Sequence, residues 1–184
     1  MSRTARALAA LLVAGGVVAS VSSVYAGTSS TSRALAEVRR ATARYHDPST
    51  ALAEGYVAAE HCVEDPQLGG MGLHYLNPAL LADPAIDPTR PEVVIYEMLP
   101  GGRLRFVAVE WFAVDPDQDL STEEGRPSLF GIPFDGPMPG HEPGMPVHFD
   151  LHAWIWKHNP AGTFAPWNPT VDCAPTRSHD PTRL

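Results

Sequence analysis

The helical spacing of apolar residues stops near residue 56, and this break limits what the rest of the chain can fold into. Beyond it, proline and glycine recur every few residues, and the whole chain holds 19 prolines and 15 glycines. Both residue types interrupt helices and favour turns between short extended segments. Residues 56–173 are therefore expected to form strands and loops.

Two helices are predicted ahead of this break. In residues 33–45, one stripe at helical spacing is formed by Leu35, Val38, Thr42 and Tyr45. A second, short helix is predicted to begin after Asp47, a favourable N-cap, with Pro48 at its first position. Gly55 ends that helix.

Strands are predicted where β-branched and aromatic residues gather. Residues 92–98 and 103–114 have this composition and are joined by Leu99-Pro100-Gly101-Gly102, which predicts a hairpin. Residues 147–156 form a third strand, and residues 72–76 a weaker one.

We therefore expect an α+β fold in a single domain over residues 33–173. Two N-terminal helices pack on a curved antiparallel sheet, and long proline-rich loops cover residues 83–91 and 115–146. A small β-barrel with the helices as a lid is the alternative.

The N-terminus has the pattern of a signal peptide, over residues 1–26. Two arginines precede an apolar stretch at residues 7–21, and small residues lead up to Ala26. The alternative, a membrane anchor, needs about 20 apolar residues. We expect export by the secretory route to the periplasm or the outside of the cell. Residues 27–32 are then a flexible leader, and residues 174–184 a disordered tail.

The charge of the chain excludes two classes of partner. The formal net charge is −8, and removal of residues 1–26 leaves 11 basic and 21 acidic residues, a charge of 11 minus 21, or −10. Nucleic acids and anionic membrane surfaces attract basic proteins. We therefore expect neither as a partner, and no membrane anchor after cleavage. The oligomeric state stays open.

The chain has two cysteines, Cys62 and Cys173. In an exported protein, two thiols more often form a disulfide than a binding site. A disulfide is therefore predicted, and a pair of soft metal ligands is the alternative.

The strand predicted at residues 147–156 has two different faces, because side chains alternate along a strand. The face expected in the core carries Val147, Phe149, Leu151, Ala153 and Ile155. The other face carries His148, Asp150, His152, Trp154 and Trp156. The sequence predicts that the two indoles on that second face line a pocket.

The imidazoles and the carboxylate of the second face suggest a binding site. Asp150 lies about 6–7 Å along the backbone from His148 on one side and His152 on the other, so either pair could hold one ion. Zinc and copper are the candidate cofactors. Alternatively, Asp150 makes one histidine more basic, or the face is simply solvated. Other candidate contributors are His74, Glu110, His141 and Glu142.

Three functions follow from this face. The leading hypothesis is an exported binding protein for a small molecule or a metal ion. The second is a hydrolytic or isomerising enzyme that uses a metal ion or a His/Asp pair on the same face. The third is a structural envelope protein with no small ligand.

Four segments carry a resemblance to a known group of proteins: residues 70–78 (GMGLHYLNP), 91–97 (PEVVIYE), 129–131 and 148–169 (HFDLHAWIWKHNPAGTFAPWNP). Together they resemble an uncharacterised family of exported bacterial proteins, over residues 40–173. The resemblance implies a bacterial origin and an envelope or extracellular location. It carries over no activity, cofactor or catalytic residue.

Overall fold

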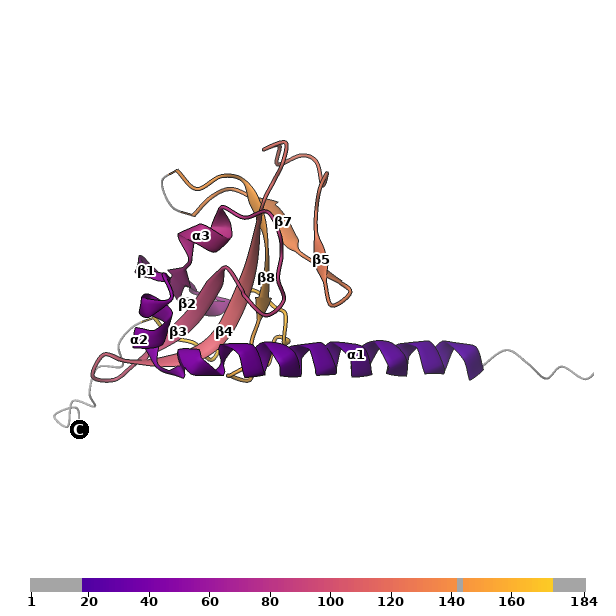
Figure 1. Ribbon diagram of the computed structural model, residues 1–184, viewed down its shortest axis with the longest axis horizontal. Helices are drawn as coiled ribbons and strands as arrows, with labels where there is room; N and C mark the ends of the chain where they lie inside the picture. The colour runs from indigo at the N-terminus through magenta and orange to yellow at the C-terminus, as the bar shows by residue number, and fades with distance from the viewer. Residues whose placement is uncertain (1–17, 142–143, 174–184) are drawn as a thin grey trace, which may run out of the picture.

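The computed structural model describes residues 18–141 and 144–173. A six-stranded antiparallel sheet in the order β1-β2-β3-β4-β8-β7 forms its body (Figure 1). Its strands are β1 Val57–Asp65, β2 Gly69–Leu76, β3 Val93–Leu99, β4 Arg103–Val114, β7 Asp135–Met138 and β8 His148–Ala153. The edge strands β1 and β7 do not pair with each other. The sheet is therefore open, and the β-barrel alternative is wrong.

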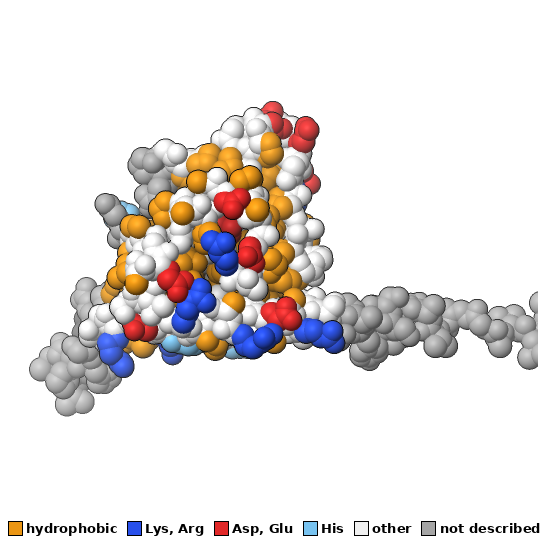
Figure 2. Space-filling model, in the orientation of Figure 1, with side chains coloured by type: hydrophobic (Ala, Val, Ile, Leu, Met, Phe, Trp, Pro, Cys, Tyr) orange, Lys and Arg blue, Asp and Glu red, His pale blue; other side chains and the backbone are white. Residues whose placement is uncertain are grey.

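The helices lie mainly ahead of the sheet, as an α+β fold requires. α1 (Val18–Thr42) runs along one side of the sheet and projects beyond it (Figure 1). It is followed by the 3₁₀ turn η1 (Ala43–His46) and by α2 (Pro48–Ala53), and a short α3 (Pro78–Leu81) follows β2. Figure 2 shows acidic and basic side chains interspersed on this face of the molecule rather than a continuous basic surface.

The predicted helical stripe is confirmed. Its four members have relative exposures of 0–8 % and face the sheet. The cap of α2 is also as expected, because the Asp47 side chain accepts a hydrogen bond from Ser49 N at 3.0 Å.

One boundary differs from the expectation. α1 begins within the predicted signal peptide and continues through residues 27–32, where the sequence predicts a flexible leader. Residues 27–32 (GTSSTS) are poor helix formers, but adding them to a helix that has already formed costs less than starting a new one. The tail predicted at residues 174–184 lies outside the described residues. Among those described, no helix is long and apolar enough to cross a membrane.

The main hydrophobic core lies between the sheet and the N-terminal helices. The sheet supplies to it apolar and aromatic side chains that include Val94, Tyr96, Val109, Trp111, Phe149 and Leu151. Tyr96 also donates a hydrogen bond from its hydroxyl to the carbonyl of Tyr45 at 2.7 Å. This bond fixes η1 over the centre of the sheet.

The predicted hairpin is confirmed, but it contains an irregularity. Gly101 has a φ of 80° and Gly102 N donates to Leu99 O, as in a tight turn that requires glycine. Further along, Ile95 pairs with Ala108 while the next residue, Tyr96, pairs with Phe106. Val107 is therefore the extra residue of a β-bulge. Beyond a bulge, the alternation of side chains between the two faces is shifted by one residue.

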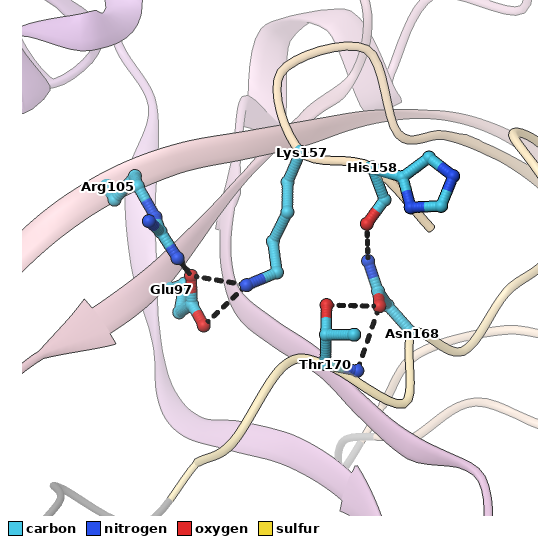
Figure 3. A network of polar contacts seen from close by, with 6 residues as sticks. All are labelled: Glu97, Arg105, Lys157, His158, Asn168 and Thr170. Atoms are coloured by element: carbon cyan, nitrogen blue, oxygen red, sulfur yellow. Dashed lines mark hydrogen bonds and ion pairs between the residues drawn. The ribbon is translucent and has the colours of Figure 1, made fainter. Parts of the chain in front are cut away.

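The last described segment, residues 154–173, crosses the sheet and secures β2. Gly70 forms a bridge with Asn168, and a Cβ on Gly69 would lie 2.4 Å from the carbonyl oxygen of Asn168, so only glycine fits there. Figure 3 shows the polar contacts around this segment, in which Lys157 donates to Glu97 and Asn168 Nδ2 donates to the carbonyl of His158. β8 therefore ends at Ala153, and residues 154–156, which were predicted to continue it, belong to this last segment.

The predicted disulfide is present between Cys62 and Cys173. It joins the middle of β1 to the end of the described chain, 111 residues later. β1 itself was not predicted, because it is irregular, with register shifts between Ala58 and Cys62 and between Val63 and Glu64. The loop expected at residues 115–146 likewise contains β7 and a small separate pair, β5 (Ser128–Leu129) and β6 (Ile132–Pro133).

A buried carboxyl group at the start of β3 predicts a pH-dependent stability. Glu92 is 2 % exposed, and burial raises the pKa of its carboxyl group from 4.5 to about 7. The folded state therefore favours the neutral form, and the contribution of Glu92 to stability falls as the pH rises from about 4.5 to about 7. Because glutamine still accepts the hydrogen bond from Phe112 N, Glu92→Gln should gain about 3 kcal/mol of stability relative to the wild type between pH 4 and pH 8.

Urea denaturation at both pH values measures this difference. Glu124→Gln, which alters an exposed carboxylate, is the matched control and should show no such change. A constant difference between Glu92→Gln and the wild type at the two pH values would contradict the prediction.

Candidate functional site

Three polar side chains from three strands meet on the face of the sheet opposite the main core. Glu110 of β4 pairs with His152 of β8, and His74 of β2 reaches the same carboxylate. Glu110 Oε2 lies 3.3 Å from His74 Nε2 and 3.5 Å from His152 Nε2. One ligand atom from each residue lies within 4.8 Å of the other two.

The cluster is buried, and several of its polar atoms lack a hydrogen-bond partner. His152 is 1 % exposed and Glu110 5 %. Four buried atoms of this face have no hydrogen-bond partner in the described structure: Glu110 Oε2, Asp150 Oδ1, His152 Nδ1 and His152 Nε2. Such atoms each cost about 1–3 kcal/mol, so a protein rarely retains several of them together without a functional reason.

The charges of the cluster depend on one another. Burial acts to raise the pKa of the Glu110 carboxyl group, but the imidazoles of His152 and His74 outweigh it and lower the pKa to about 2. Burial acts to lower the pKa of His152, but Glu110 and then Asp150 raise it to about 9. Without another cation, the pair is therefore a carboxylate beside an imidazolium.

The distances suit a metal ion. Zinc binds nitrogen and oxygen ligands at about 2.0–2.1 Å in tetrahedral sites, which places neighbouring ligand atoms about 3.3–3.4 Å apart. The two contacts of Glu110 Oε2, at 3.3 and 3.5 Å, are close to this length, and one nitrogen of each imidazole lies within 4.8 Å of the other. Two imidazoles and one carboxylate would leave a fourth position open.

The three residues of the cluster all line a cavity of about 60 Å³. Its polar lining is Glu110, Asp150, His61, His74, His141, His148 and His152. The remaining wall is apolar and consists of Ala59, Val63, Met71, Leu76, Val93, Phe112 and Met145. A small ligand could therefore reach the cluster.

His148 stands in this wall in a fixed orientation. It is 2 % exposed and stacks on Phe112, with ring centroids 4.4 Å apart. Its Nδ1 lies 3.1 Å from the carbonyl oxygen of Pro146. Because a carbonyl only accepts, Nδ1 carries a proton, and in the neutral ring Nε2 is then the acceptor.

The structure brings together most of the candidates named from the sequence. Asp150 lies 3.6 Å from His152 Nδ1, and His141 has its ring centroid 5.3 Å from that of His148. His148 and His141 line the cavity but do not belong to the three-residue cluster. Glu142 lies outside the described residues. The alternative of a solvated face is wrong, because the whole of β8 is buried on both sides.

The two tryptophans require a correction, because neither lines the cavity. β8 ends at Ala153, so the alternation that would place Trp156 beside His152 stops. Trp156 packs in the main core, where its ring lies 4.4 Å from that of His46. Trp154 packs with Val93 and Ile95 in a second apolar cluster, and its Nε1 donates to Ala165 O at 2.7 Å.

Among the histidines of the cavity, His61 alone was not anticipated, and none of the apolar residues of its wall was named as a candidate. His61 lies on the irregular strand β1, where no periodic pattern predicts the face it occupies. The sequence offered one indication that His61 has a fixed position: it is next to Cys62, whose disulfide holds this strand.

No protein-family model matches the chain, and neither a curated protein nor a solved structure is significantly similar to it.

The unsatisfied polar atoms predict that this cluster reduces stability in the metal-free protein. Glu110→Leu alone should lower the free energy of unfolding by about 3–5 kcal/mol, because it leaves His152 buried without its charge partner. The triple variant His74→Leu/Glu110→Leu/His152→Leu should be more stable than Glu110→Leu and also more stable than the metal-free wild type. Urea denaturation in the presence of a chelator compares the three proteins. A triple variant less stable than the wild type would mean that the polar groups stabilise one another.

Proposed function

We propose that this protein binds a divalent transition-metal ion, zinc in the first instance, through His74 Nε2, the Glu110 carboxylate and His152 Nε2. One observation carries the proposal. The carboxylate oxygen Oε2 of Glu110 lies close to tetrahedral ligand separations from two imidazole nitrogens, and neither this oxygen nor His152 Nε2 has a hydrogen-bond partner among the described residues.

Asp150 supports this assignment as a positioning residue. A histidine that binds a metal ion through one nitrogen usually donates its other N–H to a carboxylate or carbonyl group. Asp150 Oδ1 lies 3.6 Å from His152 Nδ1, on the side of the ring away from Glu110. The carboxylate would therefore hold His152 with Nε2 directed at the ion.

The donor types favour zinc. Zinc accepts two imidazoles and one carboxylate, and both cysteines are in the disulfide, so no thiolate is present to select Cu(I). Copper(II) binds the same donors more tightly in general. Copper is therefore the competitor that any metal analysis must measure.

The first test is zinc binding by the chain purified without chelator or affinity-tag metal. We expect one zinc ion per chain by elemental analysis. Glu110→Gln and His74→Phe should each weaken the affinity by about 100-fold or more, because each removes a ligand, and Asp150→Asn by about 10-fold. Isothermal titration with zinc measures these affinities.

His158→Phe is the matched control, since His158 is exposed and lies away from the cavity. Its affinity should equal that of the wild type. Zinc binding that survives both ligand substitutions, or no stoichiometric binding of zinc or copper to the wild type, would refute the metal site.

We infer that the protein functions outside the cytoplasm, in the periplasm or beyond the cell. The disulfide and the signal-like order of charged, apolar and small residues at the N-terminus support this inference.

Expression of the full chain in a bacterial host tests the inference. The exported protein should begin at Gly27, as determined by N-terminal sequencing or intact mass, and should contain no free thiol. Retention of Met1 in a cytoplasmic product with reduced cysteines would contradict it.

A second candidate is a hydrolytic enzyme that uses the same ion. Three protein ligands and a fourth position that opens on a cavity are the arrangement of catalytic zinc sites. The hypothesis of a purely structural protein agrees with the burial of Trp154 and Trp156 against the chain itself. It does not account for the unsatisfied polar atoms around Glu110.

A further inference from the structure

We propose that the ligand which completes the metal site is a small uncharged molecule, bound to the ion through a lone pair and to His148 through an N–H or O–H group. This inference rests on the proposed metal site and names the chemical class that the site accepts. It follows from the charge of the cavity, its volume and the orientation of His148.

The charge of the cavity wall favours a neutral ligand. Glu110 and Asp150 are the two carboxylates of the described lining, and no lysine or arginine lines it. Their two negative charges balance a divalent ion when the histidines are neutral ligands. An anion would leave a net negative charge in a buried site, and an unpaired buried charge is costly.

The volume limits the size of the ligand. A water molecule needs about 10–15 Å³ when volume is measured in this way, so a cavity of about 60 Å³ has room for about four to six water-sized groups. The ligand should therefore contain about four to six non-hydrogen atoms. The apolar side chains of Met71, Val93 and Phe112 suit a compact carbon skeleton.

His148 supplies the second contact. His148 and His152 lie on the same face of β8, four residues apart, which corresponds to about 13 Å along the strand. His148 is therefore too far away to share the ion but lines the same cavity. Its Nδ1 is directed at Pro146 O, and stacking on Phe112 holds the ring. In the neutral ring, Nε2 is therefore the acceptor for a ligand that extends from the ion.

Neutral azoles are suitable probes. Imidazole has five non-hydrogen atoms, one nitrogen for the metal ion and an N–H on the opposite side of the ring. 4-Methylimidazole and 1-methylimidazole have the same composition as each other, but only the first retains an N–H. Acetate and azide serve as small anions.

The test uses the full chain from an exporting host, loaded with cobalt(II), whose visible absorption bands respond to a change of ligand. Imidazole should shift these bands. 4-Methylimidazole should bind about tenfold more tightly than 1-methylimidazole, because the second leaves the His148 acceptor unpaired. Acetate and azide should bind about tenfold or more weakly than imidazole.

His148→Phe keeps a ring that can stack on Phe112 but removes the acceptor. In this variant the preference for 4-methylimidazole should fall to about onefold, while cobalt(II) affinity stays unchanged. His46→Phe, at an exposed histidine outside the cavity, is the matched control and should keep the tenfold preference.

The possible failures are distinguishable. If cobalt(II) does not bind, or binds equally to His74→Phe, the proposed metal site is wrong and this inference falls with it. If cobalt(II) binds but azoles leave the bands unchanged, or anions bind as tightly as imidazole, the metal site stands and the neutral-ligand inference is overturned. An equal affinity for the two methylimidazoles in the wild type would overturn the role of His148.

Discussion

The β-bulge at Val107 is the constraint on which both faces of the sheet depend. Before it, Phe106 faces the main core; after it, Val109 and Trp111 do, and Glu110 faces the other side. An unbroken alternation would place Glu110 on the same face as Phe106. The carbonyl oxygen of Val107 accepts a hydrogen bond from Trp156 N at 3.1 Å, so the last segment of the chain satisfies the irregular backbone.

The two faces of the sheet contribute to the protein in opposite ways. One packs aromatic and branched side chains against the N-terminal helices, and the burial of these groups stabilises the fold. The other buries two carboxylates and several imidazoles whose polar atoms are only partly satisfied. A small domain retains such a face at a cost in stability. The first face supplies the rigidity that holds Glu110 between two histidines.

The closure of the cavity depends on contacts that are distant in sequence. β1 brings His61 and Val63 to the wall, and the disulfide at Cys62 ties this strand to the end of the described chain. The bridge between Asn168 and Gly70 joins the same segment to β2. Gly70 lies four residues before the proposed ligand His74 on that strand. The ligand positions and the cavity wall are therefore parts of one connected framework.

Local periodicity was enough to predict the two N-terminal helical segments, the hairpin and the placement of His148, Asp150 and His152 on one strand face. The presence of only two cysteines was enough to predict the disulfide pairing. Tertiary structure decided which of the candidate side chains meet. His74 and His152 reach Glu110 through the order of strands β2, β3, β4 and β8, which no local pattern encodes. The positions of Trp154 and Trp156 also depend on the tertiary structure. Their backbone N–H groups donate to the carbonyl oxygens of Thr163 and Val107, and these bonds end β8 at Ala153.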